Sequence, residues 1–337
     1  MIIRLTILLI VTVLLPPELA AQDLHYSQFS QAAQQLNPSL NGVMPCDLRV
    51  YSFARRQWAS VTIPYRTFTA GAAMKLDALS AKLSGFSSGF VAAYDDAGDG
   101  RLRTLDLKLA LAYAFPLSSD SSHRLHIGLN GGIAQRSIDF GRLTFDNQFN
   151  GDNFIAGAPN GETFSRNSAT WSDLGIGVAW SRHQTTGDII IGISAQHLNR
   201  PEQQFMDEIE KRPLLWQAGG YGRLETATDL ELLPALQLLV QREFSELMAG
   251  VEMKKIFEQG VTGQSAIGFG IWYRSSDAIA PSFAYYKNKF RYGISYDINI
   301  SSLTKASRGA GGPEFCIVYQ WSKIKPQLNP KGVCPVY

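Results

Sequence analysis

The sequence has no block of basic residues, little net charge and no long apolar run beyond its N-terminal region. Its 337 residues carry a formal net charge of +2 that is spread along the chain. Nucleic-acid binding and polybasic attachment to a membrane surface both need clustered Lys and Arg, and the sequence contains no such cluster. No later stretch approaches the eighteen or so consecutive apolar residues that indicate a transmembrane helix. The sequence therefore predicts no nucleic-acid partner and no membrane-spanning helix.

Residues that usually build catalytic and metal sites are also scarce. The five histidines are scattered, and no G-x-S-x-G motif marks a nucleophilic serine. His123 and His126 lie three positions apart, which on a strand sends them to opposite faces, so they cannot share a metal. We predict no catalytic residue, no metal and no cofactor. A membrane-embedded hydrolase whose site is assembled from separate strands remains an alternative.

The N-terminus has the features of a targeting segment. Arg4 supplies a basic start, Leu5 to Leu15 is an apolar run too short to span a bilayer, and residues 19–21 form a small-residue cleavage site. Residues 1–21 are therefore expected to be a signal peptide. No Cys follows the cleavage site, which argues against a lipoprotein anchor. The mature chain is expected to begin at Gln22 and to be exported.

Alternation of apolar and polar residues dominates the mature chain. From Lys289 to Ile300 the alternation is unbroken, which places even-numbered side chains on one face of a strand and odd-numbered ones on the other. The even set is predicted to face lipid and the odd set the lumen of a barrel. The same rule predicts about fourteen strands, at 47–58, 64–77, 84–95, 102–115, 123–137, 169–182, 187–198, 213–226, 230–243, 245–257, 262–275, 278–287, 289–301 and 313–323.

Strand length and connection length both favour a membrane barrel. Most predicted strands have the length that a tilted bilayer-crossing strand needs, about 9 to 11 residues or more, whereas strands of soluble sheets average about five or six. If the first strand rises from the periplasm, the longest connections, 138–168, 199–212 and 302–312, all lie on the outer side and the alternate ones are all short. The predicted fold is all-β, an antiparallel transmembrane β-barrel of about 14 strands, of outer-membrane type. It would comprise an irregular lead-in or plug segment at 22–45, the barrel at 46–323 and a periplasmic C-terminal tail at 324–337.

The side chains of the predicted inner face are small or polar, with scattered charges. A polar or plugged lumen fits them better than an apolar ligand cavity. Many aromatic residues fall near predicted strand ends, where an interfacial girdle would place amphipathic rings. The inner charges are Asp106, Lys108, Glu252, Lys254, Arg291 and Asp297, and the girdle candidates are Trp58, Tyr65, Tyr113, Trp180, Trp216, Trp272, Tyr273, Tyr285, Tyr286 and Trp321.

Several short motifs follow one another along the mature chain. They begin with HYSQFSQAAQQLNPSLNG and ARRQWASVTIPYRTF, and continue with LGIGVAW, YRSSDAIA and GISYDINISSL. Together they resemble the PorP/SprF outer-membrane proteins of the type IX secretion system, which show S-Q-F, N-P-x-x-x-G, R-x-Q-W and P-x-T-F in that order. Two departures are Ala54, where the family commonly has an aromatic residue, and Gly312-Pro313-Glu314, where it commonly has S-H-E. The candidate family-motif or partner-contact residues are Asn37, Pro38, Gly42, Arg55, Gln57, Trp58, Pro64, Tyr273, Arg274, Asp277, Tyr296 and Asp297.

The resemblance implies a non-enzymatic outer-membrane component of type IX protein secretion. Its implied partners are the periplasmic and outer-membrane secretion machinery, a secreted cargo protein or adhesin, and outer-membrane lipid. In gliding members of the phylum Bacteroidetes, in which the family is found, it implies export of surface adhesins. An outer-membrane porin or transporter for small solutes is the alternative.

Local chemistry gives each motif a structural interpretation as well. Asn37, Pro38 and Gly42 suit an irregular segment that either plugs the lumen or contacts a partner. Arg55 and Gln57 share one face of the first strand and are expected to form hydrogen bonds inside the barrel, with Trp58 at the interface. The motif at 273–277 lies where a strand meets an outer loop, and its Arg and Asp are expected to hold that turn.

The chain has three cysteines, which exported proteins can use for disulfides. Cys46 precedes the first strand and Cys334 follows the last, so both are expected at the periplasmic end and a bridge between them is predicted. Cys316 starts the last strand from the outer side, too far from Cys46 for the roughly 7 Å that a disulfide allows between Cα atoms. It is expected to be a free apolar filler.

Overall fold

The computed structural model describes residues 24–322, apart from 45, 62, 152, 156, 160–165, 204–209, 261–262 and 303. The expected signal peptide at 1–21, the expected tail at 324–337 and Cys334 lie outside the described residues. Among the residues described, no helix is long and apolar enough to cross a membrane.

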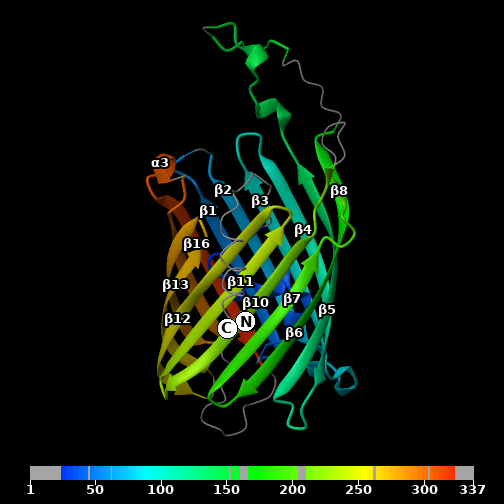
Figure 1. Cartoon of the computed structure of the whole chain (residues 1–337), viewed down its shortest axis with the longest axis vertical. Helices are drawn as coiled ribbons and strands as arrows, with labels where there is room; N and C mark the ends of the chain where they lie inside the picture. Colours follow the sequence, from blue (N-terminus) through cyan, green and yellow to red (C-terminus); the bar gives the residue numbers. More distant parts are fainter. Residues whose placement is uncertain are drawn as a thin grey trace, which may run out of the picture.

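Fourteen antiparallel strands within the described residues close into one barrel, in which each strand pairs with its neighbours in sequence and β1 pairs with β16 (Figure 1). The all-β barrel prediction is thus confirmed, including the strand number. The barrel strands are β1 (Leu48–Gln57), β2 (Tyr65–Lys75), β3 (Phe86–Ala97), β4 (Leu102–Pro116), β5 (His123–Ser137), β6 (Ser168–Gln184), β7 (Gly187–Gln196), β10 (Leu215–Ala227), β11 (Leu230–Gln241), β12 (Phe244–Gly260), β13 (Gly263–Arg274), β14 (Ala278–Asn288), β15 (Phe290–Asn299) and β16 (Ala310–Trp321).

The outer wall of the barrel is apolar, the reverse of a soluble protein. Large aliphatic side chains such as Leu109, Ile193 and Ile271 are 58–67% exposed, while a set of charged strand residues is buried, among them Lys254, Arg291 and Asp297. Along β15 every even-numbered residue is exposed and every odd-numbered one is buried, as the alternation predicts. Such a wall is stable only where lipid replaces water.

The connections sort by end, with one exception to the prediction. The three connections predicted to be longest, between β5 and β6, β7 and β10, and β15 and β16, leave the same end of the barrel, although the last is no longer than 76–85 at the opposite end (Figure 1). At the opposite end the connections are short except for 76–85, which was expected to be short but forms two 3₁₀ turns. The β5–β6, β7–β10 and β15–β16 connections contain η5 (Phe140–Arg142), η6 (Asp146–Gln148), the small β8 (Glu202–Gln203) and β9 (Glu210–Lys211) sheet, and α3 (Thr304–Ser307), while η3 (Leu76–Ala78) and η4 (Ala81–Leu83) lie between β2 and β3.

Two of the aromatic residues expected in an interfacial girdle face inward instead. Trp272 is 4% exposed and Tyr286 is 1% exposed. Each is next to an outward-facing tyrosine, Tyr273 or Tyr285, and consecutive residues of a strand point to opposite faces. The girdle prediction is therefore wrong for this pair.

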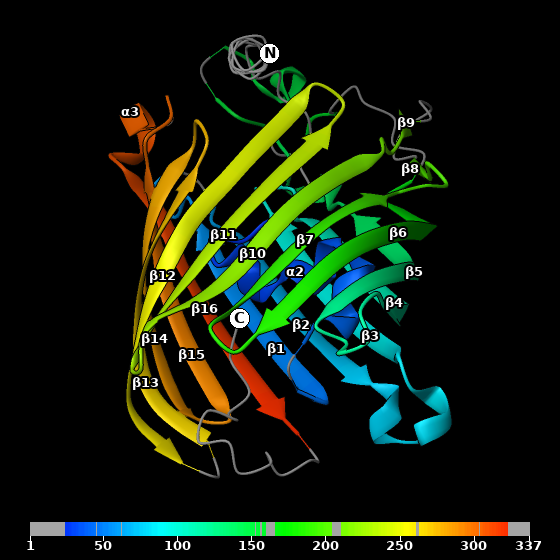
Figure 2. The same cartoon turned by 60° about the horizontal axis from the view of Figure 1, so that its bottom comes forward.

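Residues 24–44 lie inside the barrel, where the short elements η1 (Phe29–Gln31), α2 (Ala33–Leu36) and η2 (Pro38–Gly42) fill the lumen (Figure 2). We call residues 24–44 the lumen segment. Phe29, Leu40 and Val43 are buried and form a hydrophobic cluster with residues of the barrel's inner wall. The hydrophobic core of the protein therefore occupies the space that would be a water-filled channel in an open pore.

Candidate functional site: the filled lumen

The lumen segment fits against a row of small residues on the inner wall. A Cβ added to Gly128 would lie 2.4 Å from the backbone nitrogen of Ser39, and one added to Gly177 would lie 2.1 Å from the Oδ1 of Asn37. Gly128 and Gly177 are paired across β5 and β6, so their missing side chains form one continuous depression. Gly89 on β3 accommodates Asn41 in the same way. No other residue allows so close an approach of one backbone to another.

Asn37 and Pro38 explain how the chain turns within this depression. The Asn37 side chain accepts hydrogen bonds from the backbone N–H of Ser39 (3.1 Å) and from its hydroxyl (2.7 Å), which caps η2. Pro38 occupies the first turn, where its missing N–H is not needed. Asn37 also donates to the Ile193 carbonyl, and Gly42 packs against Ser87 and His126. These motif residues therefore contact the barrel's own wall.

Phe29 anchors the middle of the lumen segment. Its ring lies edge-on to Trp272, with ring centroids 5.5 Å apart, and 6.4 Å from the ring of Tyr221. Beside it, the carbonyl of Leu36 accepts hydrogen bonds from Ser194 (2.7 Å) and Gln196 (2.8 Å) on β7. The segment is thus held by apolar packing on one wall and by hydrogen bonds on the next.

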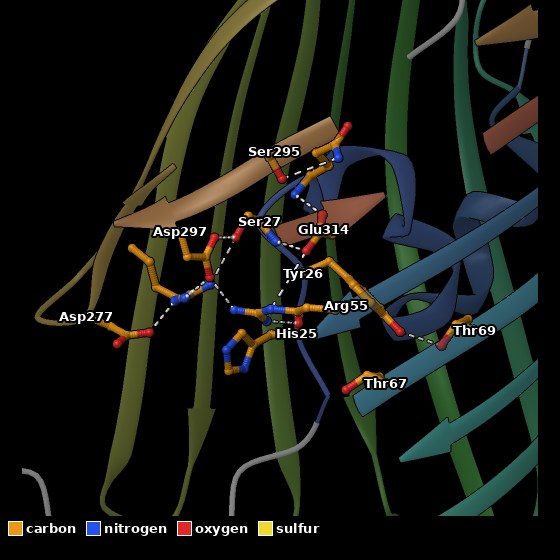
Figure 3. A network of polar contacts seen from close by, with 12 residues as sticks. His25, Tyr26, Ser27, Arg55, Thr67, Thr69, Asp277, Ser295, Asp297 and Glu314 are labelled. Carbon is orange, nitrogen blue, oxygen red and sulfur yellow. Dashed lines mark hydrogen bonds and ion pairs between the residues drawn. The ribbon is translucent and has the colours of Figure 1, made fainter. Parts of the chain in front are cut away.

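The end of the lumen nearest the β15–β16 connection holds an ionic cluster centred on Asp297 (Figure 3). Its carboxylate contacts the guanidinium groups of Arg55, at 2.5 Å, and Arg274, at 2.7 Å, and accepts a hydrogen bond from the Ser27 hydroxyl. Arg55 comes from β1, Arg274 from β13 and Ser27 from the lumen segment, and all these side chains are nearly fully buried. Removing one partner from such a buried cluster would leave uncompensated charge in a low-dielectric site.

Glu314 and Tyr26 extend this cluster along the lumen segment. The Glu314 carboxylate accepts hydrogen bonds from the backbone N–H groups of Ser27 (2.8 Å) and Gln28 (2.9 Å). Tyr26 forms a hydrogen bond with the hydroxyl of Thr69, and its burial raises the pKa of the phenol above its usual value. Side chains of β2 and β16 therefore hold residues 26–28, Tyr26 through its hydroxyl and the next two residues through their backbone N–H groups.

A second cluster centres on Arg291 near the opposite end of β15. Its guanidinium is 2.7 Å from the Glu252 carboxylate and donates to the Gln28 side chain and, at 2.8 Å, to the Cys316 sulfur. Cys316 is a free thiol, as predicted, but it is a polar partner of Arg291, so its description as an apolar filler is wrong. Cys46 is buried, and its predicted bridge to Cys334 stays a prediction because Cys334 is outside the described residues.

The remaining candidate residues divide between the two faces. The predicted turn pair exists, because Arg274 Nε is 2.6 Å from the Asp277 carboxylate, although Arg274 also reaches Asp297. Tyr273 and Tyr296 point outward, each more than 40% exposed, and contribute nothing to the ionic cluster. Gln57 ends β1, Trp58 follows it with a positive φ and packs on Tyr65, and Pro64 directly precedes β2.

Sequence reasoning missed three residues that dominate the contacts of the lumen segment: Ser27, Gln28 and Phe29. They form the S-Q-F motif, which is visible in the sequence. The hydrogen-bond partners of Ser27 and Gln28 lie more than 240 positions away, so the sequence gives no sign of them. Among the described residues, no group of His, Cys, Asp and Glu side chains is arranged to hold a metal. The lumen segment and the two ionic clusters can close the lumen and link strands of the barrel wall.

Comparison with known proteins identifies one family. Residues 18–319 match the model described as "Type IX secretion system membrane protein PorP/SprF", nearly the whole chain. A comparison with curated proteins gives no match.

Solved structures with a similar shape are barrels of very different sequence. They include CdiB from Acinetobacter baumannii (7% identity, 82% of this chain and 60% of that one, TM-score 0.43), a FadL homologue of Pseudomonas aeruginosa (8%, 85% and 93%, 0.46) and the P. putida toluene transporter TodX (7%, 88% and 95%, 0.47). The chain thus spans about 60% of the length of CdiB. At these scores the three structures carry no inference about what this chain does.

Proposed function

Since the chain belongs to the PorP/SprF family of type IX secretion system membrane proteins, we propose that it supports the secretion or surface attachment of cargo proteins, and gliding motility in cells that glide. The family match and the closed barrel support an outer-membrane component of this system, and we propose that its role is non-enzymatic. The observation that carries it is the family match over residues 18–319. The proposed partners are the secretion machinery and a secreted cargo protein or adhesin.

The filled lumen supports a docking role over a conducting one. Residues 24–44 occupy the interior and are held by wall glycines, by Phe29 packing and by the Asp297 cluster. A passive porin needs a water-filled channel through its barrel. We therefore propose that partners engage the two ends or the outer wall of the barrel, which present loops and turns, instead of passing through it.

Co-purification tests this proposal. The full-length chain carrying an affinity tag in the outer β5–β6 connection is cross-linked in growing cells, and bound proteins are identified by mass spectrometry. Recovery of type IX secretion components is expected, with an unrelated outer-membrane barrel carrying the same tag as control. Recovery of no more of these components than the control barrel yields would contradict the proposal.

The purified protein is also expected to be nearly silent in planar lipid bilayers. Because the lumen segment fills the interior, the full-length chain should show no stable open-channel current. A variant lacking residues 24–44 should conduct, because it loses the buried side chains of Phe29, Leu40 and Val43 that fill the lumen. A steady ionic current through the intact full-length chain would instead favour the porin alternative.

A further inference from the structure

The outward face of the barrel changes from apolar to charged near one end of β1–β4. Further toward the middle of these strands, the outward side chains of Phe68, Tyr94 and Leu105 are 39–51% exposed. Because side chains of a strand alternate between its faces, the residue two positions nearer the end also points outward. These positions hold Arg56 on β1, Arg66 on β2, Asp96 on β3 and Arg103 on β4. The change indicates where the hydrocarbon layer gives way to lipid headgroups, since charges on a lipid-facing wall are tolerated only near the interface.

Register pairing places these four residues side by side. Arg66 is the direct partner of Arg56 on one side and of Asp96 on the other, and Arg103 is the next residue of the row. Directly opposite residues have Cβ atoms about 4.5–5.5 Å apart, so the like charges of Arg56 and Arg66 destabilise the sheet. Both side chains are exposed, and neither forms an ion pair with another described residue. One carboxylate among three guanidinium groups leaves the row basic, and a bound anion would remove the repulsion of the Arg56–Arg66 pair.

The surroundings of the arginine pair also indicate the membrane interface. The rings of Trp58 and Tyr65, at the same end of the β1–β2 hairpin, pack edge to face with centroids 4.8 Å apart. Such amphipathic rings favour the level of the headgroups. This is the end of the barrel that the long β5–β6 connection leaves (Figure 1). At this end of β10, β13 and β15 the outward residues are uncharged, namely Trp216, Tyr273 and Ile298, so the basic row belongs to the β1–β4 side.

We propose that Arg56 and Arg66 bind the phosphorylated headgroup of a membrane lipid, whose acyl chains lie along the apolar wall at Phe68 and Tyr94. The planar guanidinium group matches a phosphate through two parallel hydrogen bonds, and two adjacent arginines can share one phosphate or clamp two. A lipid, unlike a free phosphate ion, also covers the apolar surface directly below the arginines. Lipid binding at this site is independent of any secretion partner.

Thermal unfolding of the purified full-length protein in maltoside micelles tests this site. The micelles contain no phosphate, so added lipid A with two phosphate groups should raise the melting temperature of the wild type. In Arg56→Gln/Arg66→Gln the affinity, taken from the lipid concentration that gives half of the shift, should fall about tenfold or more. Arg200→Gln/Arg308→Gln is the matched control, because it removes two exposed arginines from the β7–β10 and β15–β16 connections. The control should keep the wild-type affinity.

Further measurements separate a lipid site from a free-phosphate site and from a merely structural role. Dephosphorylated lipid A and inorganic phosphate should each shift the wild type far less, because one lacks the charge and the other the acyl chains. Without lipid, Arg56→Gln/Arg66→Gln should melt no lower than the wild type, since it loses a like-charge pair. Arg56→Lys/Arg66→Lys, which keeps the charge without the planar fork, should bind with intermediate affinity and provides a second folded variant.

Three results would overturn the proposal. The first is an equal response of the wild type and the double glutamine variant to lipid A. The second is a full response of the wild type to dephosphorylated lipid A or to inorganic phosphate. The third is a lower melting temperature of the double glutamine variant in micelles without lipid, which would make the arginine pair a structural element of the hairpin.

Discussion

Replacing Ile294 by lysine is expected to lower the stability of the barrel by about 2–4 kcal/mol, because a charge would enter the lipid-facing wall near the bilayer midplane. Ile294 lies midway along β15 and is 43% exposed on the outward face. The measurement is the urea midpoint of unfolding in lipid vesicles, together with the yield of assembled barrel.

Phe290→Lys supplies the matched control for depth. Phe290 is on the same face of the same strand but begins it, where a lysine should cost only about 0–1 kcal/mol. A lysine at lumen-facing Ser295 is unsuitable as a control, because that hydroxyl already accepts a hydrogen bond from Gln28 of the lumen segment. Equal costs at Ile294 and Phe290 would show that β15 does not cross the membrane as assigned.

Gly128→Val is expected to displace the lumen segment and to lower stability by about 1–3 kcal/mol through overpacking. The added Cβ would lie 2.4 Å from the backbone nitrogen of Ser39 and 2.5 Å from the carbonyl carbon of Pro38, and backbone atoms cannot swing aside as a side chain can. Limited proteolysis should then cut within residues 24–44, which are protected by burial in the wild type.

Gly131→Ala is the control on the same strand. A Cβ there would lie 3.4 Å from the Leu174 side chain and 4.0 Å from the Asp173 carbonyl oxygen, both ordinary contact distances. The control should retain the wild-type protease resistance and unfolding midpoint. If Gly128→Val also leaves residues 24–44 resistant, the lumen segment does not rest against β5.

Strand positions are predictable because the signal is local. Alternation within one strand records which side chain faces lipid, so the order of residues in 289–300 suffices to place β15 with its even-numbered side chains outward. An aromatic residue near a strand end does not by itself predict a place in the interfacial girdle. Of two adjacent aromatic residues such as Trp272 and Tyr273, only one can face outward.

Contacts inside the lumen are predictable only where they are local. The Arg274–Asp277 pair spans three residues and is predictable from the sequence, whereas Arg55 and Asp297 are 242 positions apart and meet only because the barrel closes. The sequence does not show what the glycines of the inner wall contact either. Gly128 and Gly177 form a depression for the lumen segment only because the register of β5 and β6 places them side by side. Closure and register, which decide this site, are properties of the whole sheet.

Deletion of the gene, followed by quantitative proteomics of the medium and the cells, tests the central claim that this chain serves type IX secretion. At least one secreted protein should disappear from the medium and accumulate inside the cells, and expression of the wild-type chain should restore its export. A deletion strain with an unchanged set of secreted and surface proteins, but with altered uptake of a small solute, would contradict the account.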